Sequence, residues 1–121
     1  MDGEFDMLRA RAVSPPADDA RLVDAAKQQA EFKLSNISGT LVGLWSPGFS
    51  SAFSVPGYHF HFISDDRKHG GHLLDCSIHS ARLRMECLTD FHLALPQNED
   101  FLKADLSRNS ADELAYAEKS H

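Results

Sequence analysis

The sequence predicts an α+β fold in one domain spanning 1–121, with a mostly antiparallel sheet, two or three short helices and a central histidine hairpin. Short runs with period-2 alternation, separated by turn residues, indicate the sheet. Helix-capping patterns near both ends indicate the helices. A length of 121 residues suffices for one modest core but hardly for two independent domains.

The predicted strands are short and mostly end at glycine, proline or serine. The run from Thr40 to Ser46 is almost wholly apolar, which is typical of a buried central strand, with Gly43 allowing close backbone approach. A turn is expected at 35–39, just before it. In the run from Ala81 to Leu88, apolar side chains alternate with charged ones, as in a half-buried antiparallel strand. The full set of predicted strands is 3–13, 31–34, 40–46, 57–63, 72–76, 81–88 and 91–95.

Three helices are expected from their capping residues. Asp18 or Asp19 can cap a helix that runs to about residue 29. Asn98 is followed by two acidic residues and can cap a short helical turn over 101–106. Ser110 and Glu113 have the spacing of a capping box, which predicts a last helix over about 111–119.

The composition excludes several classes of protein. A formal net charge of −6, with no block of basic residues, argues against nucleic acid or an anionic membrane as a partner. No run of about 18 apolar residues predicts a membrane span, and the acidic first residues do not resemble an export signal, so a cytoplasmic location is expected. Cys76 and Cys87 are too few for a disulfide scaffold and are interpreted as buried, reduced thiols.

The strongest chemical signal is a pair of histidines followed by a third. In a strand over 57–63, His59 and His61 lie on one face, because side chains alternate. The charged, glycine-containing stretch 65–71 suits a turn, after which a strand at 72–76 would bring His72 beside them. Three imidazoles that meet in this way form a catalytic metal shell with an open position. The alternative is that these histidines are ordinary packed or surface residues.

An arginine near the start offers a possible anion-binding group. In a strand over 3–13, Arg9 and Arg11 would share one face with Phe5, Met7 and Val13. An arginine on an apolar face usually extends its head group to solvent or pairs with a carboxylate. The functional alternative is a guanidinium directed at an anionic ligand, and the sequence alone leaves both possibilities open.

The histidine region resembles the signature region of the alpha-acetolactate decarboxylase family. The likeness lies in Gly57-Tyr58-His59-Phe60-His61-Phe62, in Asp65-Asp66-Arg67-Lys68 and in Gly70-Gly71-His72-Leu73-Leu74-Asp75; it extends to 39–47 and 93–106. The resemblance implies a zinc enzyme whose three metal-binding histidines are His59, His61 and His72. It also implies that Arg11 and Glu118 enter the active site. Alanines flank Arg11 where the family has threonines, and Glu118 as a solvated helix residue is the alternative.

Members of this family are longer, and the resemblance implies that this chain corresponds to their C-terminal portion. The implied function is zinc-dependent decarboxylation of 2-acetolactate, a small 2-hydroxy-3-oxo acid, to acetoin, with Zn²⁺ as the cofactor. The missing N-terminal part carries another active-site glutamate in the family. The alternative is therefore a non-catalytic metal-binding or interaction remnant of the same fold, and a homodimer is possible.

Overall fold

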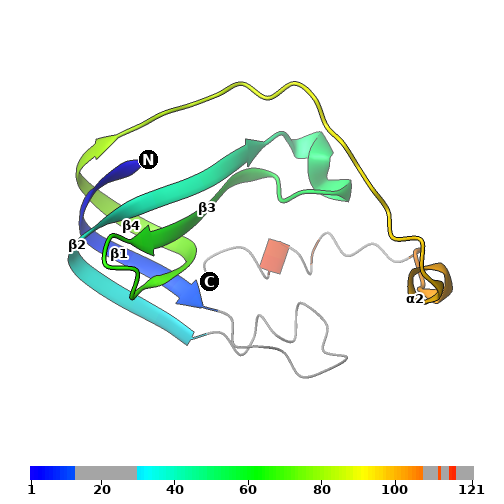
Figure 1. The fold of residues 1–121 in the computed structure, drawn as a ribbon, viewed down its shortest axis with the longest axis horizontal. Helices are drawn as coiled ribbons and strands as arrows, with labels where there is room; N and C mark the ends of the chain where they lie inside the picture. Colours follow the sequence, from blue (N-terminus) through cyan, green and yellow to red (C-terminus); the bar gives the residue numbers. More distant parts are fainter. Residues whose placement is uncertain (13–29, 108–111, 113–114, 117–121) are drawn as a thin grey trace.

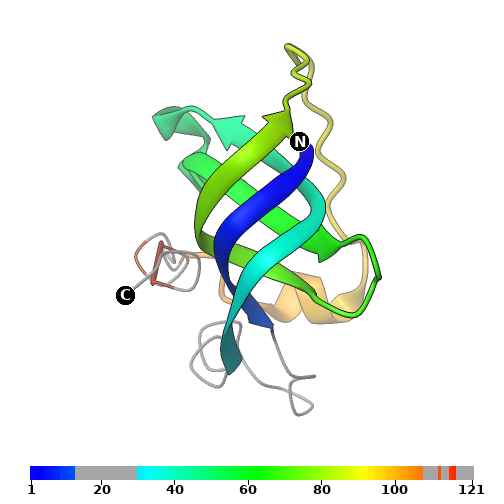
Figure 2. The same ribbon diagram turned by 90° about the vertical axis from the view of Figure 1, so that its left-hand side faces the viewer.

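Four antiparallel strands form a closed barrel in the computed structural model, which describes residues 1–12, 30–107, 112, 115 and 116 (Figures 1 and 2). The strands are β1 (Asp2–Ala12), β2 (Ala30–Ser46), β3 (Gly57–Ser64) and β4 (Gly70–Arg82). Each strand pairs with the next, and β4 pairs with β1 to close the ring. A 3-10 helix, η1 (Gly48–Ala52), joins β2 to β3. The mostly antiparallel sheet is as predicted.

The core inside the barrel is small and contains a few large side chains. Phe5, Leu8, Ala10, Leu41 and Phe62 are all buried. The rings of Phe5 and Phe62 meet edge to face, with their centroids 5.8 Å apart, which is a favourable arrangement for two aromatic rings. The backbone of Met1 exchanges two hydrogen bonds of 2.7 Å with Leu41, so the first residue helps to hold the barrel closed.

Irregular pairing in β1 changes which of its side chains face the core. A strict alternation predicted one face containing Phe5, Met7, Arg9 and Arg11, but Phe5, Leu8 and Ala10 are the core residues. The register with β4 shifts between Phe5 and Met7, and an extra residue in a strand reverses the alternation beyond it. The single predicted face is therefore wrong. The predicted Val13 lies outside the described residues.

Strand β2 is longer and less buried than the sequence predicted. The prediction of a turn at 35–39 is wrong, because β2 continues through these residues. The positive φ of 50° at Asn36 lies within the strand. The expectation of a buried central strand over 40–46 is also wrong. Leu41 is buried, but Val42, Leu44 and Trp45 are 66%, 59% and 61% exposed.

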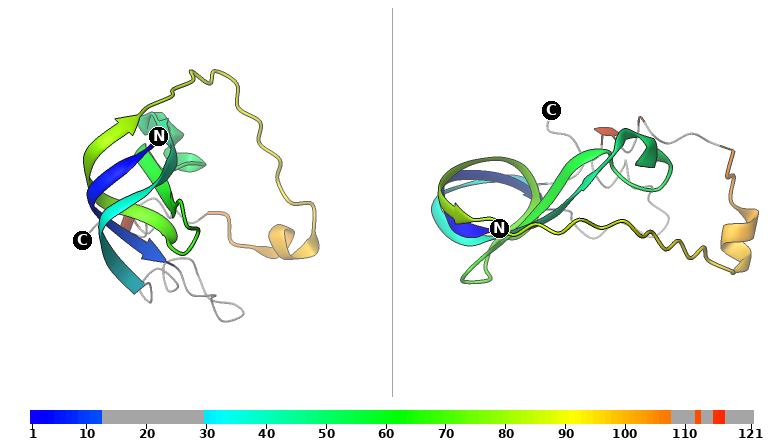
Figure 3. Two further views of the ribbon diagram at one scale, coloured as in Figure 1. Left: turned by 60° about the vertical axis from the view of Figure 1, so that its left-hand side comes forward. Right: turned by 90° about the horizontal axis from the view of Figure 1, so that it is seen from above.

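Residues 42–46 are exposed because they lie beyond the end of the barrel. Beyond the barrel, β2 and β3 continue as a two-stranded ribbon, with Leu44 opposite His59 and Trp45 opposite Tyr58 (Figure 3, right). Strand β4 pairs with β3 only from His61 to Ile63, so it does not extend along the ribbon. Gly43 permits the close approach expected of it, because a Cβ there would overlap the ring of Phe60. We call residues 42–46 and 57–60 the ribbon.

The two alternating stretches after β4 are not strands. Strand β4 ends at Arg82, and residues 83–97 run as a long trace outside the described barrel (Figure 1). Leu83 and Met85, predicted to face inward, are 56% and 85% exposed, and Cys87 is exposed rather than buried. Alternation determines which residues share a face, but burial also requires an element packed against that face. No described element covers this one.

Three helices were predicted, but within the described residues only one α-helix has defined bounds. The predicted Asn98 cap is confirmed, because its side chain accepts a hydrogen bond of 2.9 Å from the backbone N–H of Phe101, but helix α2 spans Glu99–Lys103 rather than the predicted 101–106. Residues 112, 115 and 116 are helical, but the rest of the predicted last helix and the whole predicted helix near 18–29 lie outside the described residues. No described helix is long and apolar enough to cross a membrane.

Candidate metal centre

The hairpin of β3 and β4 is held by a tight, hydrogen-bonded turn. The carboxylate of Asp66 accepts hydrogen bonds from the buried hydroxyl of Ser64, at 2.6 Å, and from the backbone of Lys68, at 3.0 Å. These bonds favour the charged form and hold the pKa of Asp66 below its ordinary value, with the bond from Ser64 having the larger effect. The turn is shorter than predicted, since β4 already begins at Gly70.

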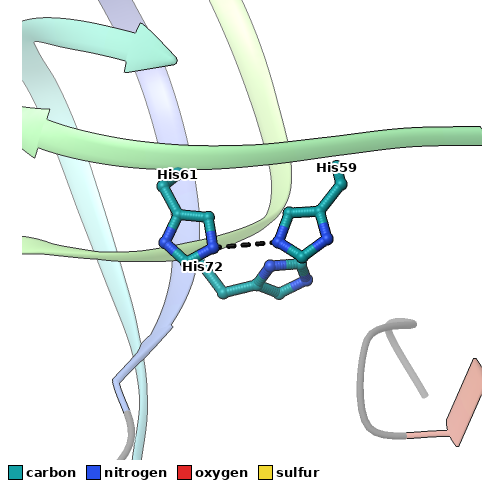
Figure 4. A group of neighbouring side chains, drawn as sticks. All are labelled: His59, His61 and His72. Carbon is teal, nitrogen blue, oxygen red and sulfur yellow. Dashed lines mark hydrogen bonds between the residues drawn. The ribbon is translucent and has the colours of Figure 1, made fainter. Parts of the chain in front are cut away.

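The hairpin brings the three histidines together, as its predicted pairing required. His61 lies directly opposite His72 in the ladder, and His59 lies two residues before His61 on the same face. Figure 4 shows the rings of His59 and His61 side by side, with the ring of His72 below them. Ring centroids are 4.8 Å apart for His59 and His72, and 5.5 Å for His61 and His72.

The spacing of the ring nitrogens suits a small metal ion. One nitrogen from each ring can be chosen so that all three lie within 4.8 Å of one another, and the Nε2 atoms of His59 and His61 are 2.9 Å apart. Two nitrogens that share a tetrahedral zinc, at about 2.0–2.1 Å each, are separated by about 3.4 Å. Small side-chain rotations would therefore bring all three within bonding distance of one ion. Three neutral imidazoles are a donor set that fits zinc well.

The three histidine rings differ in how far they are buried. His72 is buried, with 8% of its surface exposed, while His59 is intermediate and His61 is exposed. All three point to the side of the hairpin away from the core residue Phe62, which follows His61 in β3. The site therefore lies on the outer face of the barrel wall, where a small molecule could reach the exposed side of the cluster.

Arg11 lies next to this cluster in the barrel wall. It is the register partner of His72 across β1 and β4, so the two side chains leave the sheet on the same face. Its side chain is only 3% exposed. His61, His72 and Arg11 therefore lie side by side on three neighbouring strands, so the histidine cluster adjoins a guanidinium group. Of the predicted catalytic pair, only Arg11 can be placed, because Glu118 lies outside the described residues.

Gly71 lies where β4 approaches β1 most closely at the site. The sequence predicts a turn at this residue, but it lies within β4, immediately before His72. A Cβ at this position would come within 2.5 Å of the carbonyl oxygen of Arg11. The missing side chain therefore permits β4 to approach β1 where Arg11 and His72 pair. A glycine inside a strand often marks the close approach of another backbone, and its place directly before His72 in the sequence indicates this role.

Two exposed apolar side chains extend the same face along the ribbon. Val42 lies opposite His61, and Leu44 lies opposite His59, so both project from the sheet on the side of the histidines. Their exposure leaves this side of the cluster open within the described part of the chain.

Comparison with known proteins gives a consistent family likeness. The sequence profile of the family described as Alpha-acetolactate decarboxylase matches residues 1–108. The chain is 34% identical over 119 residues to the alpha-acetolactate decarboxylase of Brevibacillus brevis, and 37% identical over 122 residues to that of Methanosarcina mazei. Each match covers 98% of this chain but 42% of the relative.

A solved structure extends the likeness to the fold. The crystal structure of alpha-acetolactate decarboxylase from Bacillus subtilis strain 168 superposes with a TM-score of 0.81 at 31% identity. This match covers 98% of this chain and 52% of the solved one. The chain thus spans less than half the length of the two curated relatives and about half of the solved structure.

Proposed function

Because the chain belongs to the alpha-acetolactate decarboxylase family, we propose that it carries the metal centre for zinc-dependent decarboxylation of 2-acetolactate to acetoin and carbon dioxide. The observation that supports this proposal most strongly is the convergence of three imidazoles on one face of the hairpin. We assign His59, His61 and His72 as the zinc ligands. Three protein ligands leave a coordination position open for substrate, as catalytic zinc sites require.

The reaction needs stabilisation of negative charge next to the bond that breaks. Loss of carbon dioxide from a 2-hydroxy-3-oxo acid leaves an enediolate, which becomes acetoin when its carbon takes up a proton. His59, His61 and His72 would hold the zinc ion, which would supply Lewis-acid stabilisation of the negative charge that develops as carbon dioxide leaves.

Arg11 is assigned to the anionic end of the substrate. Its guanidinium is permanently charged, and its register position beside His72 puts it in the same wall of the site. A cation there would orient the carboxylate before carbon dioxide leaves and would stabilise the developing oxyanion afterwards. Its burial strengthens such an interaction, because less water screens the charge.

Glu118 is assigned as the group that delivers the proton to the enediolate carbon. This assignment depends on the family resemblance alone, because residue 118 lies outside the described part of the chain. A carboxyl group can transfer a proton in this way if it lies within hydrogen-bond reach of the reacting carbon. Delivery from one face would determine which enantiomer of acetoin is formed.

The test combines metal analysis with an activity assay on the purified chain. We expect about one zinc per chain, loss of zinc in His61→Ala, and acetoin production from acetolactate by the zinc-loaded protein. The matched control is His92→Ala, an exposed histidine in the trace after β4, which should retain zinc. A chain that binds no zinc, or a His61→Ala variant that binds it normally, would contradict the assigned ligands.

A second candidate is a metal-binding module without catalytic activity. It is favoured by the exposed flank of the site at Val42 and Leu44. An open site is poorly shielded from water, and shielding strengthens electrostatic catalysis. Stoichiometric zinc with no acetoin, even at high protein concentration, would favour this second candidate over the enzyme.

A further inference from the structure

The outward face of β2 changes from polar to apolar where it reaches the histidines. Phe32, Leu34 and Ile37 pack against the core. The side chains that point outward from the first part of the strand are all polar or charged: Glu31, Lys33, Ser35, Ser38 and Thr40. The next two on this face are Val42 and Leu44, which are 66% and 59% exposed. Since the solvated face of an antiparallel strand is ordinarily polar, these two apolar side chains need a local explanation.

Val42 belongs to a row of four register partners on the outer face of the barrel. It lies opposite His61, His61 lies opposite His72, and His72 lies opposite Arg11. Register partners project from the same face of a sheet. The apolar pair and the guanidinium group therefore flank the histidine cluster from opposite sides, with Leu44 opposite His59.

The width of this row suits one small molecule. Neighbouring strands are about 4.8 Å apart, so three spacings separate the backbones of Val42 and Arg11 by about 14 Å. The valine and arginine side chains occupy part of that span, and the three imidazole rings gather between them (Figure 4). A molecule of a few carbon atoms that lies over the histidines can therefore contact both ends of the row.

The two ends of the row differ in chemical character. Arg11 offers a permanent positive charge, which recognises a carboxylate. Val42 and Leu44 offer apolar surface, whose removal from water is favourable. A ligand that fits both ends has a carboxylate at one end, a short alkyl group at the other, and oxygen atoms between them. A 2-hydroxy acid with an alkyl group on the carbon that bears its hydroxyl has this arrangement.

We propose that Val42 and Leu44 form an alkyl-binding subsite of the metal centre and make its affinity for 2-hydroxy acids depend on the length of their alkyl groups. The carboxylate is held at Arg11, and the alkyl group lies on the two apolar side chains. A longer group binds more tightly because it covers more of their surface. This inference rests on the proposed function, because it places the ligand over the three histidines. It concerns binding, so its test requires no decarboxylation.

The experiment measures the binding of unreactive substrate analogues to the zinc-loaded chain by isothermal titration calorimetry. The methyl analogue is 2-hydroxy-2-methylpropanoate, and the ethyl analogue is 2-ethyl-2-hydroxybutanoate. Both carry the carboxylate and the hydroxyl group but lack the 3-oxo group that decarboxylation needs. The ethyl analogue has one additional CH₂ group in each of its two alkyl chains. Burial of a CH₂ group strengthens binding about fourfold, so we expect the ethyl analogue to bind about 4- to 16-fold more tightly.

Two variants and a matched control locate the subsite. Val42 and Leu44 are largely exposed, so the double variant Val42→Ala with Leu44→Ala should still fold. We expect its preference for the ethyl analogue to fall below about twofold, because little apolar surface remains to be covered. The control is Trp45→Ala. Trp45 follows Leu44 in β2 and is 61% exposed, but it projects from the opposite face of the ribbon, so this variant should keep the wild-type preference.

The ratio of the two dissociation constants separates a contact with the alkyl group from a structural effect, because partial misfolding would weaken the binding of both analogues alike. Equal binding of the two analogues by the wild-type chain would overturn the proposal. A double variant that keeps the wild-type ratio, or a Trp45→Ala variant that loses it, would do the same. Zinc content is measured on the same samples. A chain that holds zinc without preferring the ethyl analogue refutes the subsite alone, whereas a chain without zinc contradicts the metal centre and the subsite together.

Discussion

Replacing Gly71 by alanine tests whether the close approach of β4 to β1 builds the metal centre. The new Cβ would lie 2.5 Å from the carbonyl oxygen of Arg11, whereas ordinary contact begins at 3.4 Å. The two strands would have to separate by about 0.5 to 0.9 Å for the new Cβ to reach a tolerated distance of 3.0–3.4 Å. Backbone atoms on the opposing strand cannot rotate away as a flexible side chain could.

The separation of β1 and β4 would displace Arg11 and His72, both of which we propose to act in the active site. His72 follows Gly71 directly, and Arg11 is its register partner. Disturbing the support of a metal ligand typically weakens metal binding by about 10- to 100-fold, and that is the loss of zinc affinity we expect. Overpacking of this kind should also destabilise the barrel by about 1–3 kcal/mol.

The assay is competition for zinc against a fluorescent chelator at neutral pH, with urea unfolding measured in parallel. The matched control is Gly48→Ala, where a Cβ would meet no atom within 4 Å, and which should bind zinc like the wild type. If Gly71→Ala also bound zinc with wild-type affinity, the close approach would not matter for the site and the reasoning would fail.

Three further predictions concern the core, the turn and the anion-binding residue. Leu8→Ala should lower the free energy of unfolding by about 2–5 kcal/mol, because it leaves a cavity in the barrel, whereas Met85→Ala, at a highly exposed side chain, should change it little; urea titration compares the two. The pKa of Asp66 is lowered in the folded state, so its contribution to stability is present above the ordinary value of 3.8 and is lost as the pH falls through the folded pKa; Asp66→Asn should reduce this acid dependence in thermal unfolding, and an unchanged profile would contradict it. Arg11→Lys should leave zinc content unchanged but slow acetoin formation by at least about 10-fold, because lysine cannot present two parallel donors to a carboxylate; equal rates would exclude the assigned role.

Much of the candidate site could be predicted because it is local in the sequence. The spacing of His59 and His61 places both rings on one face of any strand, and the short connection to His72 allows little besides a hairpin. Arg11 was a weaker prediction. It pairs with His72 across 61 positions of sequence, and only the closing of the barrel by β1 and β4 brings them together.

Local sequence patterns were sufficient to predict the mostly antiparallel sheet, the histidine hairpin and the Asn98 cap of α2. They were not sufficient to predict which faces are buried, because that depends on contacts between distant segments. The register shift in β1 puts Leu8 and Ala10 on the core face in place of Met7 and Arg9, and of the strand predicted over 81–88 only Ala81 and Arg82 are in a strand, at the end of β4. Alternation is a property of one chain segment, whereas burial and strand pairing require a second segment. For residues 83–95 the described part of the chain supplies no pairing strand, and for the ribbon it supplies no element that buries Val42, Leu44 and Trp45.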